Sequence, residues 1–481
     1  MFNEGVTFST ITSGVIGFRY MPKGFCWDQS GSALIPHSSD VKCTLAILNS
    51  KITIYLAKII APTINYTIGD IANIPFNALI DGATCKKLSA FADEAIRLAK
   101  LNCQENETTY DFMMPSSNAS SGIDRTDRIN TLERFIDHEA LHLYGLTDRD
   151  LVAIDRELTD KAISIEEDTD TETNGEAEEG PAASVLSSHN WAQNWIFYAV
   201  GIVFGRFDTG VPGGLGCGDF SPEIAMSLKS LPATDGILAN DLGQPLDLAA
   251  RVWQAMETML GATEARTRVS TALGEGEPLE LLSTWFDRFT GQAGGSFWKY
   301  HFQLYRKRPV YWPLQSSGRH YTVWLFHERC TRDTLFYIRN DIVEPRLRLA
   351  ERGIADLKMR GDKDRRARKE LDPLLEFADD LREFSKRLQD ITDRGYTPHI
   401  DDGVLLNAAP LHGILPSWPE TNKAWQELEA GEYDWAQQAM EYWPERVKEK
   451  CKTNRSFAIA HGLEALYQEK PSTPKRGRRK A

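Results

Sequence analysis

Residues Leu45–Phe76 read LAILNSKITIYLAKIIAPTINYTIGDIANIPF, and their pattern predicts a helix, a break and then a strand. Pro62 is expected to end the helix, because the residue before a proline is driven out of the α region. Asn65–Asp70 predicts a short strand and turn, and Pro75 confines the next segment to a sheet edge. Such a unit is typical of the packing core of an α+β domain. Apolar positions recur with helical spacing at Leu45, Leu48, Ile52, Tyr55, Leu56 and Ile59.

The sequence of this stretch resembles that of a known protein family. The segments LNSK and PTINYTIGDIANIPF, preceded by TSGVIGFRYMPKGFCWDQSGSALIP, look like the closing half of a target-recognition domain. Such domains occur in adenine-specific DNA methyltransferases of the type IIG and BREX (PglX-like) kind, and they are related to the specificity subunits of type I restriction systems. In that family an asparagine–aromatic pair, here Asn65 and Tyr66, and the GDI..IP ending mark the end of the DNA-reading module.

The composition predicts an ordinary globular protein. The 481 residues are enough for roughly two to four domains, and apolar residues make up 42% of them. No run of about 18 apolar residues occurs and residues 1–20 lack a signal-peptide pattern, so we expect a cytoplasmic protein without a membrane segment. The seven cysteines are dispersed and form no C-x-x-C pair, which argues against a disulfide framework and against a structural zinc site.

The net charge of −13 means that a DNA-binding function needs a local basic surface. In the glycine-containing segment 1–40, which predicts short strands and hairpins, Arg19, Tyr20 and Lys23 cluster near one turn. Arginine reads guanine edges and both cations contact phosphates, so these residues are candidates for a loop that reaches a DNA groove. A solvated hairpin is the alternative. The resemblance adds Asn65 and Tyr66 as candidate DNA contacts.

Residues 81–163 are predicted to be helical, with Gly145 stopping one helix and Asp148 capping the next. Residues 164–184 carry eight acidic side chains between Glu166 and Glu179, which predicts a disordered linker. Because strand-like sequence follows Met1 directly, we expect either a separate subunit or the downstream product of a longer enzyme.

Residues 185–345 predict an aromatic-rich unit that opens with an apolar helix and a glycine-rich loop. Trp298–Arg339 is predicted to be strand-like, and Ser316–Arg319 between two apolar runs predicts a hairpin. The sequence of this strand-like stretch also resembles the region that follows the recognition domain in PglX-like enzymes. This stretch contains eight cations and two acids, which gives a net charge of +6. Such a charge predicts a phosphate-binding patch, and a charged hairpin over a core is the alternative. The cations are Lys299, Arg306, Lys307, Arg308, Arg319, Arg329, Arg332 and Arg339, of which Arg306, Lys307, Arg308 and Arg319 are the candidate DNA contacts.

The C-terminal third is predicted to be helical. Near-heptad apolar residues in 346–395 predict an antiparallel helical hairpin, of the kind that serves as a spacer or a partner surface. The expected parts of the chain are a target-recognition-like half-domain (1–80), a helical region (81–163), an acidic linker (164–184), a mixed domain (185–345), a helical hairpin (346–395), a helical region rich in tryptophan (396–468) and a basic tail (469–481).

Neither catalytic device of an adenine methyltransferase is evident in the sequence. No Pro-Pro dipeptide occurs, so the [NDS]-Pro-Pro-aromatic loop that holds a flipped adenine is absent. The glycine cluster 213–218 follows Pro212 rather than a hydrophobic strand and predicts a flexible loop. The resemblance therefore implies that no cofactor binds this chain, and that S-adenosylmethionine and the catalytic domain belong to another part of the complete enzyme.

One motif points to another class of protein. His138-Glu139-Ala140-Leu141-His142 is H-E-x-x-H, which on a helix can hold zinc with the glutamate as general base. Glu157 is a conceivable third ligand. However, the two histidines point away from the apolar face of the helix, so a chance occurrence on a solvated face is the better interpretation.

The expected fold is therefore α+β and multidomain, with a β-rich recognition half-domain, helical regions and a mixed C-terminal unit with a helical hairpin. The resemblance implies the DNA-recognition and C-terminal portion of an N6-adenine DNA methyltransferase in a phage-defence system, inactive by itself. Implied partners are double-stranded DNA, a catalytic methyltransferase domain or subunit and other defence-system proteins. A zinc metallopeptidase and a non-enzymatic scaffold are the alternatives.

Overall fold

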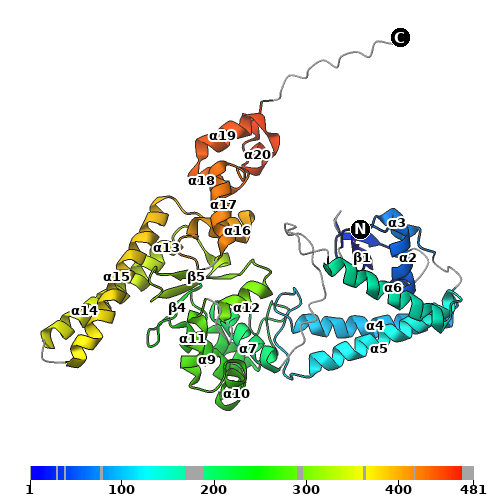
Figure 1. Cartoon of the computed structure of the whole chain (residues 1–481), viewed down its shortest axis with the longest axis horizontal. Helices are drawn as coiled ribbons and strands as arrows, with labels where there is room; N and C mark the ends of the chain where they lie inside the picture. The colour runs from blue at the N-terminus through cyan, green and yellow to red at the C-terminus, as the bar shows by residue number, and fades with distance from the viewer. Residues whose placement is uncertain are drawn as a thin grey trace, which may run out of the picture. The chain divides into compact units, whose positions relative to one another are not determined.

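The computed structural model describes residues 2–12, 14–28, 31–36, 40–75, 80–167, 188–289, 296–360, 365–416 and 418–468. The chain divides into two compact units, Met1–Trp191 and Ala192–Ala481, each with its own core. Among the described residues, helices dominate both units, and each unit contains one three-stranded antiparallel sheet (Figure 1). The fold is therefore α+β, as expected, but with fewer strands than a β-rich half-domain implies.

The sheet of the first unit is small. Strand β1 (Gly5–Ser9) lies in the centre, with β2 (Phe18–Met21) and β3 (Gly31–Leu34) antiparallel on either side. Val6 is the register partner of both Tyr20 and Leu34. The buried side chains of Val6, Phe8 and Phe18 belong to the unit's apolar core.

The single helix expected from Leu45 to Ile59 is in fact two helices, α1 (Val41–Leu48) and α2 (Lys51–Ile60), which meet at an angle of 70°. The break lies at Asn49 and Ser50. The Asn49 amide accepts from the backbone N–H of Phe18 at 3.0 Å and donates to its carbonyl at 2.8 Å. Ser50 caps α2 by accepting from the Thr53 N–H. These side-chain hydrogen bonds to backbone groups compete with the hydrogen bonds of a continuous helix. The first helix therefore ends here and the second begins.

The strand expected at Asn65–Asp70 is also wrong. Asn65 forms only an isolated antiparallel bridge with Ile11, and α3 (Ile68–Ala72) follows at once. Thr67 and Asp70 explain the helix, because each side chain accepts from the other residue's backbone N–H in a capping box.

The helices expected over 81–163 are confirmed as α4 (Gly82–Gln104), α5 (Ser121–Leu143) and α6 (Asp148–Glu167). Gly145 ends α5 with a left-handed φ of 66°. Asp148 is the first helical residue rather than the cap, because Thr147 and Asp150 make the capping contacts. Helix α6 includes 164–167, the first residues of the expected linker, and the rest of that prediction lies outside the described residues.

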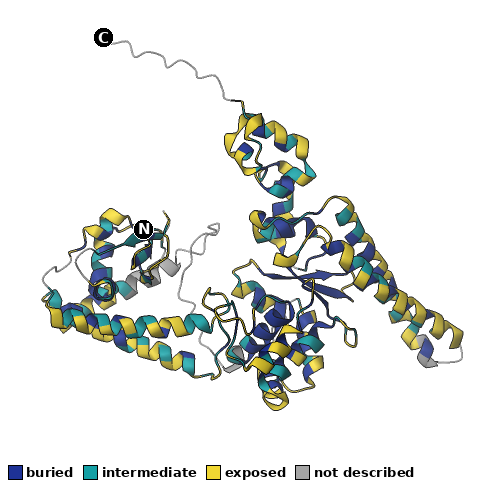
Figure 2. Cartoon of the chain, turned by 180° about the vertical axis from the view of Figure 1, so that it is seen from behind, coloured by how far each residue is buried: buried dark blue, intermediate teal, exposed yellow. Residues whose placement is uncertain are grey.

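The second unit is built around a fully buried sheet in the order β4 (Ile237–Ala239), β6 (Thr322–Phe326), β5 (Tyr311–Gln315). Every strand residue is buried, which Figure 2 shows as a dark core within the helices. The helices of this part are α7 (Ser188–Val203), α8 (Pro222–Lys229), α9 (Leu248–Leu260), α10 (Ala262–Leu273), α11 (Pro278–Asp287) and α12 (Phe297–Leu304).

The expected hairpin is confirmed. Strands β5 and β6 pair antiparallel, from Tyr311 opposite Phe326 to Gln315 opposite Thr322. The wider strand-like prediction over Trp298–Arg339 is wrong at both ends. Helix α12 occupies the start, and the 3-10 turn η1 (His327–Arg329), α13 (Thr334–Tyr337) and the π-helical turn η2 (Ile338–Val343) occupy the end.

The helical hairpin expected over 346–395 is present as α14 (Glu344–Arg360) and α15 (Arg365–Asp393). Its helices meet along buried residues that include Leu347, Ile354, Ala378 and Leu381. Short helices follow: η3 (Ile400–Asp402), α16 (Gly403–Ala408), η4 (Ala409–Leu411), α17 (Pro419–Ala430), α18 (Gln437–Tyr442), α19 (Pro444–Thr453), α20 (Arg455–Ala460) and η5 (Glu464–Leu466). The basic tail, 469–481, lies outside the described residues.

Within the described ranges, no single helix is long and apolar enough to cross a membrane. Helices α1 and α2 reach the required length and composition only as a pair, with the sharp bend between them.

Candidate nucleic-acid interface

The β2 candidates lie on different faces of the small sheet. Arg19 is exposed, whereas the neighbouring Tyr20 packs partly against the apolar core, as expected for successive residues of a strand. The Tyr20 hydroxyl donates to the Glu4 carboxylate at 2.8 Å, and this bond raises the pKa of Tyr20. Lys23 is exposed in the turn that follows β2. Arg19 and Lys23 are therefore the accessible cations of this group.

The asparagine–aromatic pair lies beside the end of β1. Tyr66 is only 3% exposed and belongs to the core, and burial raises its pKa. Its backbone N–H donates to the Thr10 carbonyl at 2.7 Å. Asn65 is exposed next to it. The structure thus gives Tyr66 a packing role and leaves Asn65 on the surface, and whether either residue contacts DNA stays a prediction.

Arg306, Lys307 and Arg308 form an exposed loop between α12 and β5. Arg306 and Lys307 have left-handed φ values of 48° and 62°, which are uncommon for residues other than glycine. The turn is closed by backbone hydrogen bonds, including Lys307 N–H to the Phe302 carbonyl at 2.8 Å. Lys307 also lies 3.8 Å from a carboxylate oxygen of Glu420. The three cations therefore occupy a defined surface turn.

The buried side chain of His301 holds the loop 306–308 in place from the core. It is fully buried, and its Nε2 accepts from the backbone N–H groups of both Val310 and Tyr311 at 3.0 Å. Its ring stacks on Phe297, with centroids 5.3 Å apart. Burial, reinforced by the charge of Arg206, lowers the pKa of His301 well below its ordinary value. A neutral imidazole therefore ties α12 to the start of β5 across the cationic loop.

Arg319 lies in the turn between β5 and β6, with a left-handed φ of 61° and an exposed side chain. The buried carboxylate of Asp380, on α15, holds this turn. It accepts from the Ser316 hydroxyl at 2.5 Å and from the Gly318 N–H at 2.6 Å. Asp380 is 64 residues from Ser316 in the sequence, so sequence spacing gave no signal for this anchoring role.

The eight cations of the expected basic patch do not form one surface. The loop 306–308 precedes β5 and Arg319 follows it, so about five strand residues, roughly 16 Å, separate them. Arg329 donates to the Gly205 carbonyl at 2.8 Å, and Arg339 donates to the Ser385 hydroxyl at 3.2 Å. The eight cations therefore include two separate basic turns and two arginines with structural hydrogen bonds, whereas Lys299 is exposed on α12 and Arg332 lies 3.9 Å from Asp333. Whether the exposed candidates contact DNA stays a prediction.

The glycine cluster 213–218 lies between helices α7 and α8 rather than between a strand and a helix. It is closely held, because the Tyr198 hydroxyl donates to the Gly216 carbonyl at 2.7 Å and Gly210 N–H donates to the Cys217 carbonyl at 2.9 Å. A Cβ at Gly216 would lie 2.5 Å from the Phe207 ring. The glycines thus allow close packing, which corrects the expectation of a flexible loop.

The H-E-x-x-H residues lie on α5. His138 and His142 are exposed, with ring centroids 4.5 Å apart. Glu139, the expected general base, instead pairs with Lys87 of α4. Glu157 accepts from the Tyr55 hydroxyl, a bond that raises the pKa of Tyr55.

Over the described ranges, no three His, Cys, Asp or Glu side chains are placed to share a metal ion. The residue before the motif has a structural use, since the buried Asp137 accepts from the Lys51 N–H at the start of α2 at 2.8 Å. The described residues therefore do not support a zinc peptidase.

The structure is thus that of a helix-dominated α+β protein, in which separate basic turns lie on an acidic chain. Adenine-specific methyltransferase BrxX of Escherichia coli O9:H4 (strain HS) is 26% identical over 447 residues, which is 86% of this chain and 36% of that protein. Adenine-specific methyltransferase PglX of Lacticaseibacillus casei (strain Zhang) is 24% identical, over 85% of this chain and 34% of that protein. No family model matches the sequence. The chain is thus a distant relative of these adenine-specific methyltransferases and spans about a third of their length.

Proposed function

We propose that this chain is the DNA-recognition and C-terminal portion of an N6-adenine-specific DNA methyltransferase of a phage-defence system, either BREX or restriction-modification. The observation that carries the proposal is the similarity over 85–86% of the chain to two proteins named as adenine-specific methyltransferases, of which it spans 34–36%. In this proposal the chain acts in the cytoplasm, binds double-stranded DNA and works with a catalytic methyltransferase domain or subunit. Other defence-system proteins are further candidate partners.

Two features support a catalytic centre outside this chain. The sequence has no Pro-Pro dipeptide for an adenine-binding loop. Both sheets of the described residues are antiparallel, whereas nucleotide-type cofactors are commonly held at the carboxyl edge of a parallel, doubly wound sheet. We therefore assign S-adenosylmethionine binding to the complete enzyme and DNA positioning to this chain.

The exposed cations are assigned to phosphate contacts. Arg19 and Lys23 make these phosphate contacts in the first unit. The loop 306–308 and Arg319 make them in the second unit. Such contacts fix the register and orientation of a protein on the duplex but carry no sequence information, so they suit a chain that presents DNA to a catalytic domain.

Fluorescence anisotropy with the purified chain and a mixed-sequence duplex tests the proposal. We expect micromolar or tighter binding whose affinity falls steeply with salt, because phosphate contacts release counterions. The chain alone is expected to transfer no methyl group from tritiated S-adenosylmethionine to the same duplex. Absence of binding at low salt would contradict the proposal and favour a scaffold that binds only proteins.

A further inference from the structure

Two of the seven cysteines lie in one apolar cluster of the first unit. Cys43 is in the first turn of α1 and Cys85 is in the first turn of α4. Cys43 is 1% exposed, whereas Cys85 is partly buried and packs against the same cluster. The residues 44–84 separate them in the sequence, so only the fold brings them into one cluster.

The two cysteines lie on the helix faces along which α1 and α4 pack. On α4, Cys85, Leu88 and Ala92 have the i, i+3, i+7 spacing of a single face, and all three belong to the apolar cluster. On α1, Cys43 and Ile47 are one turn apart and belong to it as well. Each thiol is therefore directed at the neighbouring helix rather than at solvent.

The side chains of Cys43 and Cys85 are hydrogen-bonded to each other. Burial, followed by this hydrogen bond, raises the pKa of Cys43, so its thiol stays protonated. Lys42, next to Cys43, pairs with Asp93 and so also joins α1 to α4. Both cysteines are reduced in the structure, and no other described cysteine forms a hydrogen bond with a second thiol.

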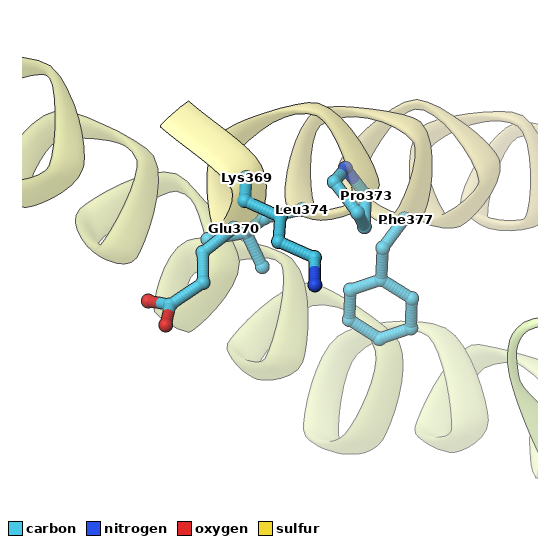
Figure 3. A pocket seen from close by; sticks show the side chains of 5 residues that line it. All are labelled: Lys369, Glu370, Pro373, Leu374 and Phe377. Carbon is cyan, nitrogen blue, oxygen red and sulfur yellow. The ribbon is translucent and has the colours of Figure 1, made fainter. Parts of the chain in front are cut away.

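The shallow hollow on α15 offers no comparable chemistry (Figure 3). Lys369 and Glu370 supply one charge of each sign, and the rest of its lining is apolar, from Pro373, Leu374 and Phe377. None of these five side chains is a thiol, a hydroxyl or an imidazole. The cysteine pair, in contrast, contains both groups that a new covalent bond needs.

We propose that Cys43 and Cys85 are a reactive dithiol pair, which a peroxide converts to an intramolecular disulfide that joins α1 to α4. Cys85 reacts first, because a small solute reaches its partly exposed sulfur, whereas Cys43 is closed off from solvent. This modification site does not depend on the proposed function.

The reaction with hydrogen peroxide balances in two steps. The Cys85 sulfur attacks one peroxide oxygen, the O–O bond breaks, and a sulfenic acid and one water molecule form. The Cys43 sulfur then attacks the sulfur of that sulfenic acid, the S–O bond breaks, and the leaving hydroxide takes the Cys43 proton to become a second water molecule. Two thiols are thus oxidised to one disulfide while the peroxide is reduced to water.

The bond constrains the first unit. A disulfide that closes the loop 44–84 lowers the conformational entropy of the unfolded chain and so favours the folded unit. Helix α1 ends next to Asn49, whose amide binds both backbone groups of Phe18 in β2. The disulfide therefore ties the small sheet, through α1, to the long helix α4.

Peptide mapping of the full chain tests the site. The chain is treated with hydrogen peroxide, its remaining thiols are alkylated, and it is digested with trypsin without a reductant. Trypsin releases Cys43 in the peptide 43–51 and Cys85 in the peptide 59–86, and neither peptide contains a second cysteine. Mass spectrometry should find these two peptides joined, with two hydrogen atoms fewer than their sum, and dithiothreitol should separate them.

Two variants separate the pair from the other cysteines. Cys85→Ala removes the accessible thiol and should abolish the joined peptide. The matched control, Cys103→Ala, changes another partly buried cysteine of α4 and should leave the joined peptide as abundant as in the parent chain. In urea, followed by circular dichroism, the peroxide-treated parent should unfold at a higher concentration than the reduced parent, and treated Cys85→Ala should show no such shift.

Either of two results would overturn the inference. In the first, peroxide oxidises the exposed Cys26, yet Cys43 and Cys85 are recovered in separate alkylated peptides. In the second, Cys85 is recovered joined to a different cysteine, or a non-reducing gel shows that its disulfide links two chains.

Discussion

His301 shows how a single buried side chain sets the position of a surface loop. Because its Nε2 accepts two backbone N–H groups, it must stay neutral, and its pKa is lowered well below the ordinary value near 6.5. The unfolded chain takes up a proton there as pH falls through about 6.5, and the folded chain does not. We therefore expect the second unit to be most stable above pH 6.5 and to lose stability between about pH 6.5 and 5.

Urea unfolding followed by tryptophan fluorescence at several pH values measures this effect. His301→Gln removes the titrating group and should flatten part of the pH dependence, although it lowers stability at neutral pH. His327, whose pKa is also lowered by burial, accounts for a remaining slope. His142→Gln, at an exposed position on α5, controls for the replacement of a histidine as such. An undiminished slope in His301→Gln would contradict the assignment.

Asp380 has the corresponding role at the second basic turn. It is 7% exposed and accepts from Ser316 and Gly318, so Asp380→Asn sets an amide N–H against one of these donors. We expect a loss of about 1–3 kcal/mol in the free energy of unfolding, as for other buried groups left without a partner. Urea unfolding measures the change. Asp379→Asn, next to it but exposed, should cost less than about 1 kcal/mol. Similar effects from both variants would show that the anchoring bonds contribute little.

Among the elements, the break between α1 and α2 depends on one long-range contact. The Asn49 amide binds both backbone groups of Phe18 and so covers the outer edge of β2, which would otherwise present unpaired groups. Asn49→Ala is expected to destabilise the first unit by about 1–3 kcal/mol. Hydrogen exchange of β2 peptides should increase in this variant. Asn130→Ala, on the exposed face of α5, serves as control, and equal exchange in both variants would refute the role of Asn49.

The same elements show what the sequence could predict. Local patterns were sufficient for α4, α5, the β5–β6 hairpin and the α14–α15 hairpin, because each is specified by its own periodicity or turn residues. The continuous helix over Leu45–Ile59 was a wrong prediction, since its break depends on Phe18, 31 residues from Asn49. The separation of the candidate cations into two turns was not predicted for a similar reason. Residues close in sequence lie at opposite ends of β5, and Asp380, which fixes Arg319, comes from a distant helix.

At the scale of the whole molecule, charge is distributed unevenly. The net charge is −13, yet exposed cations lie in the turns at 306–308 and Arg319. An acidic chain repels DNA at long range, so the DNA binding that we propose requires such local groups to supply the attraction at contact distance.

The division into two compact units predicts two unfolding transitions, because each unit has its own apolar core. Ten of the twelve tryptophans belong to Ala192–Ala481, so fluorescence reports mainly on the second unit, whereas far-UV circular dichroism reports on both. In urea, Asn49→Ala should shift one phase of the dichroism curve to lower concentration and leave the fluorescence midpoint unchanged. Asp380→Asn should move the fluorescence midpoint. If Asn49→Ala moved both signals together, the two units would unfold as one cooperative structure.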